Sequence, residues 1–170
     1  MQHDAFSGIE PHGTRRRVDE SSRLFEVFIN HRGPDVKQTL ALQLYNSLTD
    51  LGVNAFLDLE EKELGDSFPS TIENAILSAS AHIAIFSEGY AESPWCLAEL
   101  VLMLQSSAKI IPLFYGVEPS ALRYIEKGKY GKAFAKYEEK GRYMEKLKDW
   151  KEALQTVSYI TGYEISSHFK

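Results

Sequence analysis

The sequence predicts an α/β fold, a doubly wound parallel sheet of four to five strands flanked by helices. Short runs of β-branched and aromatic residues alternate with helical segments four times along the chain. Three of the four runs are almost continuously apolar, which is typical of parallel strands that are covered on both faces. Strands that alternate with helices form βαβ units, and their right-handed crossovers place helices on both sides of the sheet.

The four runs predict strands at residues 25–29, 53–57, 83–86 and 110–115. No run marks a fifth strand, and we expect it, if the sheet has one, within the irregular glycine-bearing stretch 116–141. Between the first two runs, apolar residues recur at steps of three or four from Val36 to Leu51. Gly52 ends this predicted helix.

Two further helices are predicted from their ends and their apolar spacing. One begins near Pro69, where Ser70 and Glu73 have the spacing of a capping box. The last helix carries an apolar stripe of four residues, Leu147, Trp150, Leu154 and Val157.

The helix before the fourth strand begins at Ser93, a favourable N-cap that is followed by proline at the first helical position. Its apolar stripe consists of Leu97, Leu100, Val101 and Leu104. Trp95, Glu99 and Met103 are spaced by four residues and are predicted to lie along the opposite face. On this pattern alone, Glu99 is most simply a solvated glutamate near a helix N-terminus, and Trp95 a packing residue.

A chain of 170 residues fits one domain. We expect a disordered polar leader at 1–23, the domain at 24–165 and a short tail at 166–170. The single cysteine, Cys96, excludes an internal disulfide, and the five histidines lack the spacing of a metal site. No apolar stretch is long enough to span a membrane and no signal peptide is recognisable, so we expect an intracellular protein. A net charge of −5 disfavours nucleic acid as a partner.

The residues at the strand ends exclude several enzyme classes. Ligands of open parallel sheets bind beyond the carboxyl ends of the strands, where the strand order reverses. A phosphoacceptor receiver domain needs acidic residues where Asn30, His31 and Ser87 stand. The sequence also lacks the phosphate loop of flavodoxins, G-x-G-x-x-G, the P-loop and the G-x-S-x-G elbow of serine hydrolases.

Four segments in order resemble the TIR (Toll/interleukin-receptor) domains of plants, at residues 25–35, 87–90, 93–100 and 111–120. The third segment, S-P-W-C-L-A-E-L, is the most specific of them, and the last helix with Thr161-Gly-Tyr163 fits the same family. The resemblance extends over about residues 24–165 without large gaps. It implies a single TIR domain with a flavodoxin-like sheet.

The resemblance also implies an activity. Many plant TIR domains hydrolyse NAD to nicotinamide and ADP-ribose, some cyclise the ADP-ribose, and their catalytic carboxylate is the glutamate that matches Glu99. The substrate-binding residues of the family match His31, Arg32, Gly33, Ser87 and Trp95. NAD, with NADP as an alternative, is then the substrate, and neither a cofactor nor a metal is expected. Such proteins act in plant immune and cell-death signalling.

Family members self-associate through TIR–TIR contacts, and this sequence departs from their pattern. The Ser-His pair that many plant members carry at one contact is replaced by Leu42-Gln43, and the usually basic loop after the second strand is acidic at 58–65. We therefore expect self-association through another contact or with lower strength.

A non-enzymatic scaffold that binds other TIR domains is the alternative function, which the intact glutamate motif disfavours. The leader and tail favour a TIR-only protein over a receptor fragment, in the cytoplasm or, alternatively, the nucleus.

Overall fold

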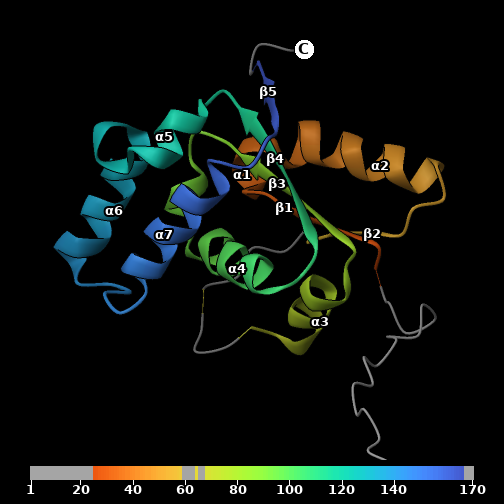
Figure 1. Ribbon diagram of the computed structural model, residues 1–170, viewed down its shortest axis with the longest axis horizontal. Helices are drawn as coiled ribbons and strands as arrows, with labels where there is room; N and C mark the ends of the chain where they lie inside the picture. Colours follow the sequence, from red (N-terminus) through yellow and green to blue (C-terminus); the bar gives the residue numbers. More distant parts are fainter. Residues whose placement is uncertain (1–24, 59–63, 65–67, 167–170) are drawn as a thin grey trace, which may run out of the picture.

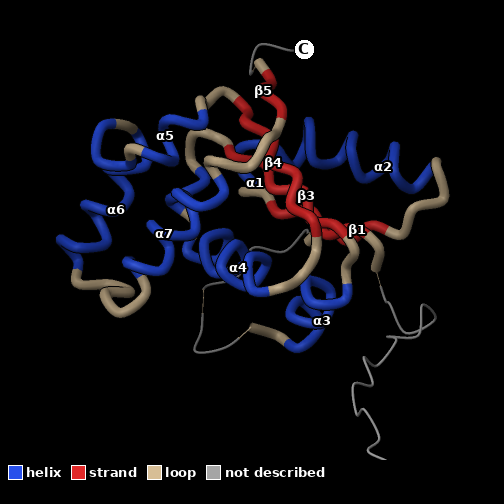
Figure 2. Tube along the Cα trace, in the orientation of Figure 1, coloured by secondary structure: helices blue, strands red, loops and turns tan. Residues whose placement is uncertain are grey.

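The computed structural model describes residues 25–58, 64 and 68–166. These residues form a parallel sheet in the order β2-β1-β3-β4-β5, which Figure 1 shows as arrows and Figure 2 in red. The strands are β1 (Val27–Asn30), β2 (Ala55–Leu57), β3 (Ala81–Phe86), β4 (Lys109–Tyr115) and β5 (Tyr163–Ile165). The predicted fold class is confirmed. The predicted leader at 1–23 and residues 167–170 of the tail lie outside the described residues.

The fifth strand is not where the sequence analysis expected it. β5 follows the last helix and pairs with β4 at the edge of the sheet, with Phe114 aligned to Glu164. Its residues are mostly exposed, so it has no apolar run that would mark it in the sequence. The stretch 116–141 is helical instead, and contains α5 (Pro119–Arg123), a 3₁₀ turn (Ile125–Lys127) and α6 (Lys129–Lys140).

Helices cover both faces of the sheet, as predicted. On one side of the sheet in Figure 1, α2 (Leu42–Asp50) packs Leu44 and Leu48 against a cluster that contains Ile29 and Ile85. The opposite face is covered by α3 (Ser70–Ser78), α4 (Pro94–Gln105) and α7 (Leu147–Val157). Neighbouring strand residues point to opposite faces of the sheet. Ile29 therefore packs in the cluster on the α2 side, and Phe28 in the cluster on the opposite side.

The first predicted helix is broken rather than continuous. It begins as α1 (Gly33–Val36), continues as a π-helical segment (Lys37–Ala41) that is kinked at Thr39, and only then becomes α2. Gly52 follows the end of α2 with a φ of +80°, as expected of a terminating glycine. Leu51, predicted as part of the apolar stripe, is 79% exposed, because the chain has already left the helix there.

The capping box predicted for the second helix is not formed. Pro69 is the N-cap of α3, which places Ser70 inside the helix, and no side chain caps this end. Among the described residues, no helix has the length and apolar character needed to cross a membrane.

The strand order reverses between β1 and β3, which are direct neighbours in the sheet. In a doubly wound sheet, the crevice at this reversal is the usual place for a ligand. The residues just beyond the ends of β1 and β3 are therefore the first to consider.

Candidate functional site

Helix α4 begins next to the reversal point. The backbone N–H of Cys96 donates to Ser93 Oγ at 3.1 Å and Pro94 follows Ser93, so the predicted N-cap is confirmed. The helix is buried on nearly all sides, because it lies between the sheet, α3 and α7. The helix pattern alone predicted a solvated Glu99, and this is wrong, because the Glu99 side chain is buried. Trp95 is buried as well, which agrees with its interpretation as a packing residue.

Glu99 is a carboxyl group in the interior, and only 3% of it is exposed. Its Oε1 accepts a hydrogen bond from Asn30 Nδ2 at 3.0 Å, and its Oε2 accepts none within the described part of the chain. Asn30 is the last residue of β1, and the Tyr90 hydroxyl donates to its Oδ1. The Asn30 amide at the end of β1 is thus held by Tyr90 and donates to the Glu99 carboxyl group on α4.

Burial raises the pKa of Glu99 to about 8. The hydrogen bond from Asn30 opposes this rise, the negative charge of Asp58 adds to it, and the indole N–H of Trp95 opposes it again. The indole N–H is near enough to affect the pKa, but among the described residues Trp95 Nε1 reaches no acceptor with hydrogen-bond geometry. Glu99 is therefore mostly neutral at pH 7, and a cation placed beside it would favour its ionised form.

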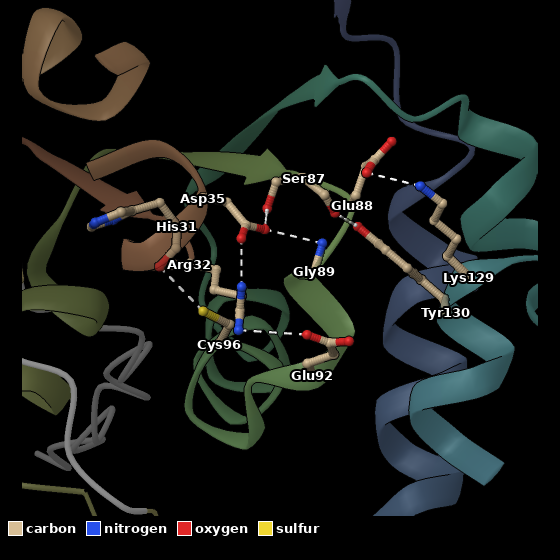
Figure 3. Close-up of polar contacts among 10 residues, drawn as sticks. All are labelled: His31, Arg32, Asp35, Ser87, Glu88, Gly89, Glu92, Cys96, Lys129 and Tyr130. Atoms are coloured by element: carbon tan, nitrogen blue, oxygen red, sulfur yellow. Dashed lines mark hydrogen bonds and ion pairs between the residues drawn. The ribbon is translucent and has the colours of Figure 1, made fainter. Parts of the chain in front are cut away.

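A second polar group lies at the same edge of the sheet, and Figure 3 shows its contacts. Asp35 pairs with the Arg32 guanidinium, while its Oδ2 accepts hydrogen bonds from Ser87 Oγ at 2.6 Å and from the Gly89 N–H at 3.0 Å. Arg32 also lies 3.5 Å from a carboxylate oxygen of Glu92. A Cβ atom on Gly89 would lie 2.7 Å from Arg32 Nη1 and 2.8 Å from Asp35 Oδ2, so a larger residue here would displace these side chains.

Helix α6 holds the loop after β3 from its other side. The Tyr130 hydroxyl donates to the Ser87 carbonyl oxygen at 2.6 Å, and Lys129 Nζ pairs with Glu88 at 2.8 Å (Figure 3). Asp35 and α6 therefore fix this loop between them, and the loop leads directly into α4.

The structure divides the six predicted site residues into groups. Arg32 and Ser87 meet through Asp35, whereas Trp95 and Glu99 lie one turn apart on α4. Within the described residues, no hydrogen bond or ion pair joins Glu99 to Arg32 or Ser87. The predicted residues thus share one edge of the sheet without forming one contact network.

The remaining two predicted residues are next to Arg32 in the chain. The carbonyl oxygen of His31 accepts a hydrogen bond from the Cys96 thiol at 3.2 Å, which ties the end of β1 to α4. The His31 ring points away from the Asp35 group in Figure 3. Gly33 is the first residue of α1 and is partly exposed.

Sequence reasoning missed Asn30 and Asp35 as site residues. Asn30 is a polar residue at the end of an apolar strand, and this position was itself a signal. Asp35 lies within a segment that carried the family resemblance, but nothing local shows that it would reach Ser87, 52 positions later in the chain.

One aromatic neighbour of Trp95, Phe68, is among the described residues. The Phe68 ring lies edge-on to Trp95, with ring centres 5.2 Å apart. Of the acidic loop predicted at 58–65, only Asp58 and Leu64 are among the described residues.

Comparisons with known proteins agree with this architecture. The family model described as TIR domain matches residues 24–169. The TIR domains of the activated Roq1 resistosome, which directly recognises the pathogen effector XopQ, superpose with a TM-score of 0.74. Their sequence is 34% identical, and the match covers 82% of this chain and 87% of that chain.

Two curated relatives are plant proteins. A Brachypodium distachyon protein named "Probable 2′ cyclic ADP-D-ribose synthase BdTIR" is 44% identical over 98 residues, which are 58% of this chain and 44% of that protein. TMV resistance protein N of Nicotiana glutinosa is 35% identical over 143 residues, which are 81% of this chain and 12% of that protein. The matches thus span less than half the length of either relative.

Proposed function

Because this chain belongs to the TIR-domain family, we propose that it cleaves the nicotinamide–ribose bond of NAD with Glu99 as the catalytic carboxylate. The observation that carries the proposal is the state of Glu99. It is a buried acid with one hydrogen bond and a pKa raised to about 8, and it contacts the end of β1, where the strand order reverses. Burying such a group costs stability, so a functional role explains it better than a structural one.

One carboxylate is sufficient for this reaction. Glycosidases usually need a second, acidic group to protonate the leaving oxygen, but nicotinamide is cationic in NAD and departs as a neutral ring. The positive charge then develops on the ribose, where an ionised Glu99 stabilises it. The cationic nicotinamide ring itself favours this ionised form, because a nearby opposite charge lowers the pKa of an acid.

The other site residues have binding and positioning roles in this proposal. Arg32 binds the diphosphate, since a guanidinium offers several donors to phosphate oxygens. Asp35 positions Arg32 and, through Ser87, the loop that leads into α4. Trp95 forms a wall of the pocket, and His31 and Gly33 line its entrance beside Arg32. NADP contains the same bond and is the alternative substrate.

Two outcomes of the reaction are proposed. If water captures the ribosyl cation, the product is ADP-ribose, and if a hydroxyl of the same molecule captures it, a cyclic isomer forms. The name of the Brachypodium distachyon relative specifies a 2′ cyclic product. We also propose self-association, because one matching solved structure is a resistosome that contains TIR domains. Activity per molecule should then rise with protein concentration. In this proposal the reaction products are messengers in plant immune signalling.

The test is incubation of the purified protein with NAD over a range of protein concentrations. Nicotinamide and its partner products are followed by chromatography and mass spectrometry. Glu99→Gln should lower the rate by about 10³-fold, the order expected for loss of a charge-stabilising group. Glu73→Gln removes a charge from an exposed position of α3 and should retain the parent rate. No nicotinamide release at concentrations where the protein self-associates would favour a TIR scaffold instead.

A further inference from the structure

A cavity of about 550 Å³ lies between the start of α4 and the end of α6. Four cationic side chains line it, Arg32, Lys136, Lys140 and Arg142. Glu92 is the one carboxylate among the described lining residues, and it lies 3.5 Å from Arg32. This concentration of positive charge is unusual in a chain whose net charge is −5.

Two of the cavity's cations, Lys136 and Lys140 of α6, have no ion-pair partner among the described residues that would explain their position. Lys136 and Lys140 are one helical turn apart, and like charges at this spacing destabilise a helix. Neither forms an ion pair within the described part of the chain, whereas Lys129 and Lys151 both do. The helix dipole favours Lys140 at the C-terminal end of α6, but it does not explain why other cations face the same cavity.

Aromatic rings form another wall of this cavity, from Trp95, Tyr137 and Tyr143. Tyr143 has a φ of +56°, the only positive value at a non-glycine position among the described residues. Its ring is held 5.3 Å from that of Trp150 and 5.8 Å from that of Tyr137, between ring centres. This wall is therefore fixed to the core, and Arg142 lies with its guanidinium carbon 5.1 Å from the centre of the Tyr143 ring.

We propose that this cavity binds a nucleoside diphosphate group, with the phosphates on Lys136, Lys140 and Arg142 and the base or sugar against the aromatic wall. Its volume lies within the usual range of small-molecule sites, roughly 300–1,000 Å³. Charge-assisted hydrogen bonds from several cations suit a diphosphate, and a fixed ring suits a base. A nucleic acid would instead follow an open basic groove past successive rings.

The same group has two sources. Arg32 and Trp95 line the cavity and also belong to the proposed active site, so the ligand is either the adenosine diphosphate part of NAD or a separate nucleotide. The first source rests on the proposed function. The second does not.

The first experiment measures ADP binding to the full chain by isothermal titration calorimetry. The parent should bind ADP, and Lys136→Glu/Lys140→Glu should weaken binding by about tenfold or more, the loss expected when a charged hydrogen bond is removed. Lys132→Glu/Lys148→Glu changes the net charge equally at exposed positions outside the cavity and should bind like the parent. Circular dichroism checks that each variant is folded.

Three results would overturn the proposal. The first is that the parent does not bind ADP at about millimolar concentration. The second is that the two double variants weaken ADP binding equally. The third is that Lys136→Glu/Lys140→Glu weakens binding of a single-stranded oligonucleotide but leaves ADP binding unchanged. The last would indicate a nucleic-acid surface. Because Glu99 does not line the cavity, Glu99→Gln should bind ADP as the parent does.

Inhibition kinetics distinguish the two sources. If ADP raises KM for NAD without changing kcat, the cavity holds the substrate's own diphosphate part. If ADP binds but changes kcat, or leaves NAD cleavage unchanged, a separate nucleotide is the ligand. ADP binding without any NAD cleavage would support the cavity and refute only the proposed function. NAD cleavage without ADP binding would support the proposed function and refute ADP binding in the cavity.

Discussion

Glu99 and Asp35 are two carboxyl groups at the same edge of the sheet, in opposite environments. Asp35 has a side chain that is 21% exposed, pairs with Arg32 and accepts hydrogen bonds from Ser87 and Gly89. Glu99 is almost fully buried and accepts a single hydrogen bond, from Asn30. A carboxylate with a full set of donors holds its neighbours in place. One that is left with a single donor remains available to a cation that arrives with a ligand.

This difference separates stability from activity. Removal of the Asp35 carboxylate leaves Arg32, Ser87 and Gly89 without their shared acceptor, so the fold should lose stability. Replacing Glu99 by a residue that cannot ionise removes the cost of keeping this acid un-ionised, or of ionising it, in the interior, so above about pH 4.5 the fold should gain stability while the proposed reaction is lost. The following predictions test this contrast.

The largest expected effect is on the pH dependence of stability. The pKa of Glu99 is about 8 in the folded protein, above its usual 4.5, so its contribution to stability is fully present below pH 4.5 and is lost as the pH rises through 8. Glutamine does not titrate. Glu99→Gln should therefore gain stability relative to the parent between these values, by at most about 1.4 kcal/mol for each unit of pKa difference.

Urea unfolding of both proteins at about pH 5 and pH 9 measures this difference, since all other titrating groups are shared. A stability difference that does not change with pH would show that Glu99 ionises without penalty, and would contradict its burial.

The next largest effect is expected at Asp35. Asp35→Ala should lower the free energy of unfolding by about 2–3 kcal/mol, because a partly buried cation and two donors lose their partner together. Urea unfolding at neutral pH measures the loss. The matched control is Glu88→Ala, which breaks an exposed pair with Lys129 on the same loop and should change stability by less than about 1 kcal/mol. Equal losses in the two variants would contradict a special role for Asp35.

The third effect concerns rates, and it rests on the proposed cleavage of NAD. Since the ionised form of Glu99 is the active one, kcat/KM should rise with pH and level off above about 8. The profile of kcat should lie at lower pH, because bound nicotinamide favours the charged carboxylate. Profiles that coincide, or that fall with increasing pH, would refute this assignment.

Asn30→Ser extends the same test. The hydrogen bond from Asn30 lowers the pKa of Glu99, so its loss should move the kcat/KM profile to higher pH and reduce the rate at pH 7 by about tenfold. The deficit should shrink at alkaline pH. Tyr90→Phe, which leaves the Asn30–Glu99 bond intact, should move the profile less. A deficit that is constant with pH would mean that Asn30 acts only through packing.

Most of the architecture could be predicted from local pattern. Four strands have mainly apolar runs, three of them almost continuous, and the start of α4 is marked by Ser93 and Pro94. β5 could not be found in this way, because a short and largely exposed edge strand has no apolar run. Its position depends on a tertiary contact: a Cβ on Gly162 would lie 2.2 Å from the Pro112 carbonyl oxygen, so only glycine lets the chain pass β4 this closely.

The environment of Glu99 was the main error of the sequence analysis. Its place opposite the apolar stripe of α4 suggested a solvated side chain, but α7 and α3 cover the helix as well as the sheet does. Their positions depend on contacts between distant parts of the chain, which periodicity within one helix does not report. Asn30 and Asp35 were missed for the same reason, since each gains its role from a partner more than 50 positions away.

The smallest expected effect is at Glu92, the second carboxylate beside Arg32. Its side chain is 53% exposed and lies 3.5 Å from Arg32 Nη2, so water screens the pair. Glu92→Gln should change the free energy of unfolding by less than about 0.5 kcal/mol in urea titrations. A loss as large as that of Asp35→Ala would mean that neutralising Arg32 is what stabilises this edge. A small loss would assign the effect to the hydrogen bonds that Asp35 alone accepts from Ser87 and Gly89.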